Sequence, residues 1–354
     1  MRKKGNQGVK IGSTYVGHNH PTFFVAEIGI NHNGDLSLAK QLIHNAKYAG
    51  ASAVKFQKRN SKEVFTEKML HEAYNSPNAY GKTYGEHREA LEFSFEQCSE
   101  LMDYAKGLDI LFFSSVWDES SVDFMTSLGV DAFKIASADA DNFRLIDKVI
   151  STKKPILIST GMSTQSEVES VVSHVSNQTN KFIFFQSTSL YPASVETLNL
   201  SFIKTLLKMS KGNPVGYSGH ESDLMPSLIS VALGASIIER HITLDKKSKG
   251  SDHAASLLPS EFKKLVDDSK SLKSMLGSTM KPSLSEDVKK MRRKLGKSLY
   301  YASDFESGHR LRVSDLKLLS PGDGVSPMLE IKFVNKKLKR GVKYQEPLKA
   351  SDFE

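Results

Sequence analysis

Short apolar segments rich in β-branched and aromatic residues alternate along this chain with longer segments whose apolar residues recur at helical spacing. The longer segments include residues 36–50 (LSLAKQLIHNAKYAG) and 165–176 (QSEVESVVSHVS), which we predict to be amphipathic helices. The short segments are predicted strands: FFVAEIGIN from Phe23, AVKFQKR from Ala53, ILFFSSV from Ile110, AFKIAS from Ala132, PILIST from Pro155, FIFFQST from Phe182, PVGYSG from Pro214 and IIERHIT from Ile237. Strands that alternate with helices indicate an α/β protein with a parallel sheet.

Two α/β architectures fit this alternation. Eight strands, each followed by a helical segment, match a closed (β/α)8 TIM barrel. A doubly wound open sheet is the alternative. The first predicted strand is not followed by a glycine-rich dinucleotide-binding motif, and this favours the barrel.

The length of the chain also indicates a second domain, and its composition indicates a folded protein. A chain of 354 residues leaves room for a barrel and a small additional domain. With 39% hydrophobic and 25% charged residues the chain falls in the ordinary globular range, which argues against a disordered or fibrous protein.

Localisation and metal chemistry are constrained by what the sequence lacks. The basic N-terminal segment MRKKGNQGVK is not followed by the apolar stretch of a secretory signal, and no later segment is long and apolar enough to span a bilayer. We therefore expect a cytoplasmic protein. Cys98 is the single cysteine, so the chain has no internal disulfide and any metal must be bound by histidine and carboxylate.

The net charge of +8 comes from the C-terminal part of the chain. Residues 289–354 hold 16 of the 48 Lys+Arg and 8 of the 40 Asp+Glu, which leaves 32 of each in residues 1–288. Such a basic region binds nucleic acid in some proteins, but here it lacks the interleaved aromatic residues of a stacking platform. A solvated basic face is the preferred interpretation; an anionic substrate or a partner surface would use the same charge.

Polar residues cluster where each predicted strand ends, and in a barrel these ends meet on the face that carries the active site. The pairs are Glu27 and Asn31, Lys55 and Gln57, Ser114 and Ser115, Lys134 and Ser137, Ser159 and Thr160, Gln186 and Ser187, Ser218 and His220, and Glu239 and His241. Lys55 and Lys134 lie within apolar strands, where an unpaired ammonium is costly. They therefore need an anion, either Glu27 or Glu239 in an internal ion pair or the phosphate or carboxylate of a ligand.

Two histidines end the last two predicted strands. Because the strands are neighbours in a barrel, the imidazoles of His220 and His241 can meet at one divalent ion. Histidines in separate segments are more often ordinary core or surface residues. The carboxylates of Glu27, Glu239 and Asp252 nearby favour the metal site.

The motifs AEIGINHNGDLSLAKQLIHNAKYAGASAVKFQ, FKIAS, ILISTGM, Tyr191-Pro192, GYSGH and IERHIT follow one another in this order. In this combination the chain resembles the sialic acid synthase family, which includes N-acetylneuraminate, legionaminate, pseudaminate and spore-coat polysaccharide synthases. The resemblance extends over nearly the whole chain.

The resemblance implies a role for individual residues. Glu27 and Glu239 match the catalytic acidic residues, and His220 and His241 match the ligands of a divalent metal ion, Mn²⁺ or Mg²⁺. The positions that match the substrate-binding residues are Lys55, Gln57, Ser115, Lys134, Ser137, Ser159, Ser189, Tyr191, Ser218 and Asp252. Ser115 and Ser189 stand where some members have Thr and Asn.

The implied reaction condenses phosphoenolpyruvate with an open-chain N-acetylhexosamine aldehyde, N-acetylmannosamine-like, and water. It yields an N-acetylneuraminate-like nonulosonic acid and phosphate. A 2,4-diacetamido sugar, as used by legionaminate or pseudaminate synthases, is the alternative substrate. Several members carry Arg where this chain has Ser320, so the resemblance does not identify the acceptor sugar.

The resemblance also implies the domain layout and the assembly. Residues 1–283 match the catalytic barrel, 284–295 a lysine- and serine-rich linker, and 296–354 a small β-rich antifreeze-like (SAF, β-clip) domain. In bacterial members this domain caps the partner's barrel, which implies a domain-swapped homodimer. Ice or nucleic-acid binding by the basic C-terminal domain is the alternative from another class; ice binding requires a weakly charged surface, which this domain lacks.

Overall fold

The computed structural model describes residues 8–354, so the first seven residues of MRKKGNQGVK lie outside the described residues. The chain divides into two compact units, Met1–Gly277 and Ser278–Glu354. This division lies just before the linker predicted at 284–295. Residues Glu286–Leu295 of that linker form a helix, α12, which begins at the N-cap Ser285.

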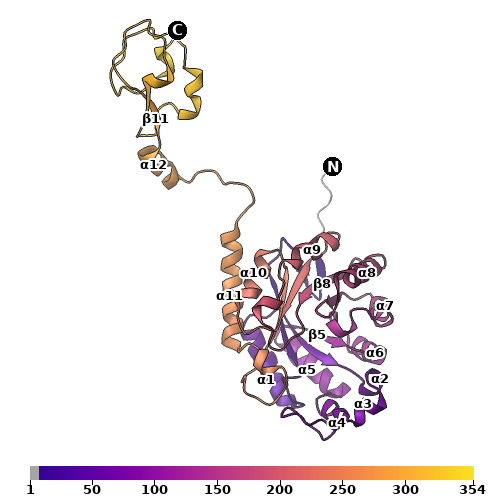
Figure 1. Ribbon diagram of the computed structural model, residues 1–354. Coiled ribbons are helices and arrows are strands. Elements are labelled where there is room, and N and C mark those ends of the chain that lie inside the picture. The colour runs from indigo at the N-terminus through magenta and orange to yellow at the C-terminus, as the bar shows by residue number, and fades with distance from the viewer. Residues whose placement is uncertain (1–7) are drawn as a thin grey trace. The chain divides into compact units, whose positions relative to one another are not determined.

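The first unit is the predicted parallel barrel, and the open-sheet alternative is wrong. Within residues 8–277, β10 pairs in parallel with both β9 and β3, which closes the sheet (Figure 1). The barrel strands are β3 (Phe23–Gly29), β4 (Ala53–Lys58), β5 (Leu111–Val116), β6 (Phe133–Ile135), β7 (Ile156–Ser159), β8 (Phe182–Ser187), β9 (Val215–Gly219) and β10 (Ile237–His241). Each lies within a segment predicted from the apolar pattern.

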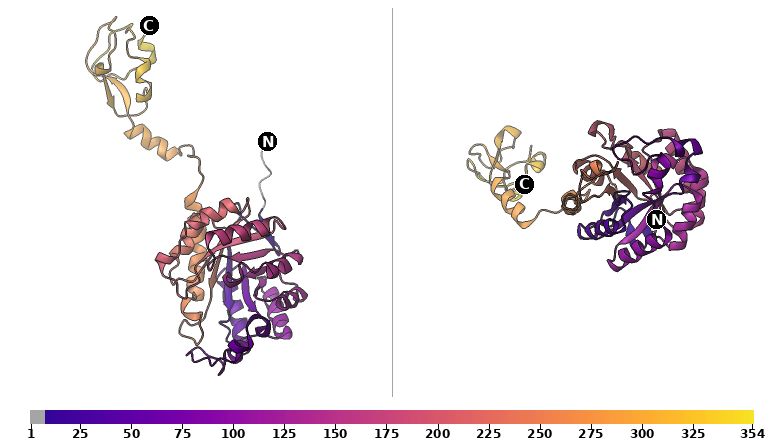
Figure 2. Two further views of the ribbon diagram at one scale, coloured as in Figure 1. Left: turned by 45° about the vertical axis from the view of Figure 1, so that its right-hand side comes forward. Right: turned by 90° about the horizontal axis from the view of Figure 1, so that it is seen from below.

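Helices surround these strands (Figure 2). They are α1 (Leu36–Tyr48), α5 (Phe95–Gly107), α6 (Glu119–Leu128), α7 (Phe143–Ser151), α8 (Gln165–Ser176), α9 (Phe202–Met209), α10 (Met225–Ala232) and α11 (Pro259–Leu276). The start of α8 shows how local sequence sets a boundary. Thr164 and Glu167 exchange side-chain to backbone hydrogen bonds in a capping box, which satisfies amides left free at a helix start.

The barrel core explains why the strand segments are almost continuously apolar. Every residue of β3 and of β8 is buried, because one face packs inside the barrel and the other against helices. Cys98, on α5, is a free thiol in this core, and burial raises its pKa to about 12.

Two further segments of the first unit lie outside the regular alternation of barrel strands and helices. A hairpin of β1 (Val9–Ile11) and β2 (Thr14–Val16) precedes β3. Between β4 and α5 the chain makes an excursion through α2 (Ser61–Val64), α3 (Glu67–His71) and α4 (Tyr84–Glu89). The hydroxyl of Tyr80 in this excursion donates to the carbonyl of Lys249, 2.6 Å away, and so fixes it to the segment that follows β10.

The second unit is β-rich, as predicted. Its antiparallel strands β11 (Ser298–Tyr301) and β12 (Leu316–Leu319) accompany a separate core that includes Leu299, Tyr301 and Leu338. No helix within residues 8–354 is long and apolar enough to cross a membrane.

Candidate active site

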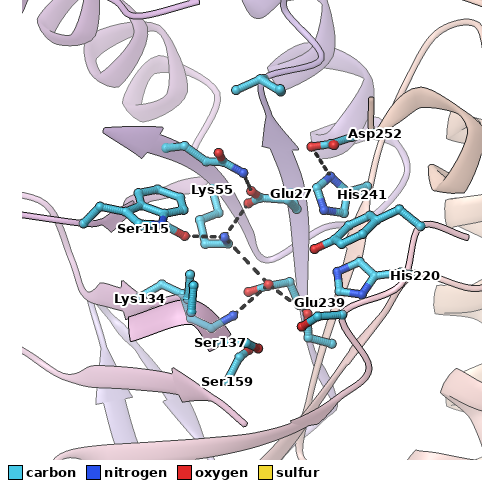
Figure 3. A pocket seen from close by; sticks show the side chains of 18 of the residues that line it. Glu27, Lys55, Ser115, Lys134, Ser137, Ser159, His220, Glu239, His241 and Asp252 are labelled. Atoms are coloured by element: carbon cyan, nitrogen blue, oxygen red, sulfur yellow. Dashed lines mark hydrogen bonds and ion pairs between the residues drawn. The ribbon is translucent and has the colours of Figure 1, made fainter. Parts of the chain in front are cut away.

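A cavity of about 300 Å³ opens at the C-terminal ends of the barrel strands (Figure 3). The fourteen residues to which the resemblance assigns a role all line it: Glu27, Lys55, Gln57, Ser115, Lys134, Ser137, Ser159, Ser189, Tyr191, Ser218, His220, Glu239, His241 and Asp252. Five of the sixteen strand-end residues do not: Asn31, Ser114, Thr160, Gln186 and Ser187. The strand-end pattern therefore located the pocket, and the roles of the residues remain predictions.

Strand register explains this convergence. In the parallel ladders, Glu27 on β3 pairs with Lys55 on β4 and, on its other side, with His241 on β10. Next to β4 in the sheet, Ser115 on β5 pairs with Lys134 on β6. Residues that share a level of a barrel point to one centre, so distant segments of sequence contribute to one polar layer.

Lys55 lies in the centre of this layer. Its Nζ is 2.7 Å from Oε2 of Glu27 and 3.7 Å from Oε1 of Glu239, and it donates to the hydroxyl of Ser115 at 2.6 Å. Burial favours the neutral amine, but the carboxylates of Glu239 and Glu27 outweigh it and raise the Lys55 pKa above its ordinary value. Lys55 is therefore a buried ammonium.

Glu239 binds its neighbours through one oxygen. Its Oε1 accepts hydrogen bonds from Nζ of Lys134 at 2.8 Å and from the hydroxyl of Ser218 at 3.1 Å, whereas Oε2 is buried without a hydrogen-bond partner. Burial alone would raise its pKa, but Lys134 and Lys55 together lower the pKa of Glu239 to about 2. Burial and the neighbouring ammonium of Lys55 lower the pKa of Lys134, against the attraction of Glu239.

Hydroxyl groups gather beside the lysines at the ends of β6, β7 and β8. The hydroxyl of Ser159 is buried with no hydrogen-bond partner. Gly161 lies among three more: a Cβ added there would meet Oγ of Ser189 at 2.7 Å, Oγ of Ser187 at 2.8 Å and Oγ of Ser137 at 3.1 Å. The amide of Gly161 donates to Oγ of Ser137 at 3.0 Å, so these hydroxyls pack directly against the glycine. Such a group of hydroxyls suits a small anion that accepts several hydrogen bonds.

The two histidines face each other on the opposite wall, with ring centroids 5.5 Å apart. Nδ1 of His220 is 2.7 Å from the carbonyl oxygen of Thr188, to which it donates, so the other ring nitrogen is free to accept. Burial, then the neighbouring His241, lower the His220 pKa to about 3, which keeps the ring neutral. Nδ1 of His241 is buried without a hydrogen-bond partner, 3.8 Å from Oδ2 of Asp252.

These features fit a metal held by two protein ligands. A neutral imidazole, fixed by a carbonyl on its other nitrogen, is the usual state of a metal-binding histidine. No cluster of three or more His, Cys, Asp or Glu side chains suited to a metal occurs within residues 8–354. A cation here would therefore depend on substrate or water for its remaining positions.

Gln57, Tyr191 and Asp252 also line the pocket. Nε2 of Gln57 donates to Oε1 of Glu27 at 3.0 Å. The ring of Tyr191 lies 4.1 Å from that of His220, and burial raises the Tyr191 pKa. Asp252 accepts from the hydroxyl of Ser251 at 2.6 Å.

Sequence reasoning missed two arginines that line the same cavity, Arg59 and Arg88, and the aromatic ring of Trp117, which directly follows β5. A signal for Arg59 was present, because alternate residues of a strand share a face and Arg59 follows Lys55 and Gln57 at that spacing. Arg88 carried no such signal, since it lies on α4 in the excursion. The other lining residues not foreseen are Ile30, Ala136, Ala138, Met162 and Ser251.

Known proteins with similar sequences and folds were then compared with the chain. A model described as "NeuB family" matches residues 42–281. The chain is 42% identical over 302 residues to N-acetylneuraminate-9-phosphate synthase of Mus musculus, covering 85% of this chain and 84% of that protein. It is 37% identical over 311 residues to N,N'-diacetyllegionaminic acid synthase of Legionella pneumophila, covering 86% and 87%.

Solved structures agree with this result. The N-acetylneuraminic acid (sialic acid) synthetase of Leptospira borgpetersenii, solved with citrate, superposes with a TM-score of 0.72 at 31% identity, over 82% of this chain and 97% of that one. A putative spore coat polysaccharide biosynthesis protein E of Chromobacterium violaceum has a TM-score of 0.79 at 23% identity, over 94% and 99%, and supports the fold alone.

Proposed function

The chain belongs to the NeuB family and is a synthase of the sialic, legionaminic or pseudaminic acid type; from this premise we propose that it joins phosphoenolpyruvate to an open-chain N-acetylhexosamine aldehyde. C3 of phosphoenolpyruvate forms a bond to the aldehyde carbon, whose oxygen takes up a proton. Water adds at C2, and phosphate leaves with cleavage of the C2–O bond. The products are a nine-carbon 2-keto acid and inorganic phosphate.

This proposal rests on a group of cations and hydroxyls, suited to bind an anion, that lies next to two carboxylates. Lys55 and Lys134 provide two buried ammonium groups, and the unpartnered hydroxyl of Ser159 lies in the same cavity. Charge-assisted hydrogen bonds suit both anionic groups of phosphoenolpyruvate. Holding the enol rigidly beside the aldehyde would supply much of the acceleration.

The carboxylates are placed to handle protons. Glu239 remains ionised because of its two lysine neighbours, and its free Oε2 is available as an acceptor. Glu27 is oriented from two sides, by Lys55 at 2.7 Å and by Gln57 at 3.0 Å. Both carboxylates are thus held in defined positions inside the cavity, and we propose that they move the protons of the reaction.

We propose His220 and His241 as ligands of a divalent cation, Mn²⁺ or Mg²⁺. When bound, it would supply Lewis-acid polarisation of the aldehyde oxygen. Charge balance supports this assignment: Lys55, Lys134, Glu27 and Glu239 sum to no net charge, so an anionic donor brings negative charge that a dication would offset.

The named relatives make different products, which include N-acetylneuraminate 9-phosphate, N,N'-diacetyllegionaminic acid and pseudaminic acid. We propose an N-acetylmannosamine-like acceptor, with a 2,4-diacetamido sugar as the alternative. Ser320 lies in the C-terminal unit, where its hydroxyl accepts from Nζ of Lys297 at 3.0 Å. It offers no guanidinium to the sugar.

Phosphate release tests the proposal. Full-length protein supplied with Mn²⁺ and phosphoenolpyruvate should release phosphate only when an amino sugar is added. The panel comprises N-acetylmannosamine, its 6-phosphate and 2,4-diacetamido hexoses. Equal release without sugar would indicate a phosphatase, and no release with any sugar would overturn the proposed function.

A further inference from the structure

Two arginines line the active-site cavity, and the reaction described above uses neither. Arg59 directly follows β4 and lies on the same face as Lys55 and Gln57. Arg88 reaches the cavity from α4. The cavity therefore has cationic groups in two places, the lysine pair and this arginine pair.

Arg59 is 6% exposed, and its guanidinium has neighbours on one face and at two of its nitrogens. Its carbon Cζ lies 4.1 Å from the ring centre of Trp117, and one nitrogen donates to Oε1 of Gln57. Nε lies 3.3 Å from Oε1 of Glu92 but makes no hydrogen bond. Burial, and then the charge of Arg88, lower its pKa to about 10, so the group is still charged at neutral pH.

The cations outnumber the anions here. Glu92 is shared with Lys58, whose Nζ is 3.0 Å from Oε2 of the carboxylate. Among residues 8–354 no carboxylate lies within 4.0 Å of the nitrogens of Arg88. Its only side-chain acceptor in that range is the neutral hydroxyl of Tyr84, at 2.6 and 2.9 Å. Two adjacent guanidiniums with one shared carboxylate favour a further anion.

Glu27 and Gln57 lie between the lysine pair and the arginine pair. Lys55 is 2.7 Å from one oxygen of Glu27, Nε2 of Gln57 donates to the other at 3.0 Å, and Oε1 of Gln57 accepts from Arg59. A donor held by Lys55 and Lys134 therefore leaves the arginines available for a second anionic group. An open-chain sugar whose aldehyde reacts beside Glu27 would direct its other end toward the arginines, past Gln57.

We propose that Arg59 and Arg88 form a subsite for a phosphomonoester on the amino sugar, at the end opposite the aldehyde. A phosphomonoester carries close to two negative charges and matches the planar forks of two guanidiniums. A neutral acetamido group would leave Arg88 uncompensated. The inference rests on the proposed function, and it narrows the acceptor to a phosphorylated N-acetylhexosamine.

Steady-state kinetics with two sugars test the subsite. Full-length parent protein with Mn²⁺ and phosphoenolpyruvate should show a higher kcat/KM for N-acetylmannosamine 6-phosphate than for N-acetylmannosamine. Arg88→Met should reduce this preference about ten- to a hundredfold through the KM of the phosphorylated sugar, since a hydrogen bond to a charged group contributes about 1.5–3 kcal/mol. The KM for phosphoenolpyruvate and the efficiency with the unphosphorylated sugar should not change.

Three further variants test whether the preference depends on the charge and shape of the two guanidiniums. Arg88→Lys keeps the charge without the fork and should retain part of the preference. Arg59→Lys should act in the same direction. Arg144→Met is the control, because Arg144 is 89% exposed and pairs with Glu119 outside the cavity, and it should leave both sugars unaffected. Equal efficiency of the two sugars with parent protein, or an equal loss for both in Arg88→Met, would overturn the subsite.

A binding measurement separates this inference from the proposed reaction. Calorimetric titration with N-acetylmannosamine 6-phosphate needs no turnover, and Trp117, the one tryptophan of the chain, reports binding at Arg59 by fluorescence. The parent should bind the phosphorylated sugar, and Arg88→Met should bind it at least tenfold more weakly. If binding holds but no phosphate is released, the reaction is wrong and the subsite stands. If Arg88→Met binds as tightly as the parent, the subsite is wrong whatever the activity.

Discussion

Lys134 and Glu239 lie on strands separated by three others in either direction around the barrel, yet Nζ of Lys134 is 2.8 Å from Oε1 of Glu239. The ion pair spans the barrel interior, and its charges are nearly inaccessible to water. Lys55 has Glu27 as its nearer partner, at 2.7 Å, but it also lies 3.7 Å from Glu239, so, within residues 8–354, Lys134 shares its only carboxylate with Lys55. An incoming phosphate or carboxylate can therefore bind to Lys134 without first breaking a complete ion pair.

Lys134→Ala should weaken the use of phosphoenolpyruvate. The loss of one charge-assisted contact costs about 1.5–3 kcal/mol, so KM, turnover or both should worsen about ten- to a hundredfold. Lys148→Ala is a suitable control, because Lys148 pairs with Asp123 outside the cavity. A folded Lys134→Ala protein that saturates normally with phosphoenolpyruvate would mean that the ion pair is purely structural.

Activity should depend on a divalent cation bound by His220 and His241. Chelation should abolish phosphate release, and His220→Ala should bind Mn²⁺ at least tenfold more weakly in a calorimetric titration. His174→Ala provides the comparison, since His174 pairs with Asp147 on the helical surface. Full activity of metal-stripped protein, or unchanged Mn²⁺ affinity in His220→Ala, would refute the ligand assignment.

Gly161→Ala should impair donor binding without unfolding the barrel. The added Cβ would come within 2.8 Å of the hydroxyl oxygens of Ser187 and Ser189, which must then rotate away. The KM for phosphoenolpyruvate should rise while the melting temperature changes little. Gly107→Ala, where a Cβ meets no atom within 4 Å, is the matched control. An unaltered KM in Gly161→Ala would place the donor elsewhere in the cavity.

Much of this arrangement was predictable because barrel strands impose simple periodicities. Apolar runs gave the strand positions, and polar residues at their ends gave the pocket. The two-residue alternation of side chains along a strand also predicts the position of Arg59, which follows Lys55 and Gln57 on the same face. Arg88 could not be placed this way, because its position depends on an excursion fixed by a contact between Tyr80 and Lys249, 169 residues apart. Such long-range contacts leave no local pattern.

The stability of the barrel should fall in mild acid because of His32. This ring is buried against Phe93, with centroids 4.2 Å apart, and burial lowers its pKa to about 3 from 6.5. Between those pH values the unfolded chain binds a proton that the folded one does not, so the free energy of unfolding falls as pH decreases, by at most about 1.4 kcal/mol per pH unit.

Urea unfolding of parent and His32→Gln at pH 5, 6 and 8 measures this contribution. Glutamine keeps an acceptor for the amide of Gly34, which is 3.1 Å from Nδ1 of His32. The variant should lose less stability than the parent between pH 8 and pH 5. Parallel pH profiles for the two proteins would show that His32 does not carry the dependence.

The C-terminal unit should be needed for catalysis but not for folding of the barrel. The two hydrophobic cores share no residue, so a chain that ends at Gly277 keeps the whole barrel core and every proposed site residue. It should fold and bind Mn²⁺, yet fail to condense the substrates. The physical reason is exclusion of water from the reacting aldehyde, which a covering domain supplies.

A mixed assembly tests whether that cover comes from the partner subunit. Met328 and Ile331 of the C-terminal unit are 91% and 86% exposed, and Met162 and Val195, in loops after β7 and β8, are 62% and 59% exposed. We expect these side chains to lie in the contact if a C-terminal unit covers a barrel. Full-length His241→Ala protein has a defective barrel and an intact C-terminal unit, whereas the chain ending at Gly277 has the reverse. Each alone should be inactive, and co-assembly should restore part of the activity if a domain-swapped homodimer forms. Co-assembled chains that remain inactive would show that the C-terminal unit acts only on its own barrel.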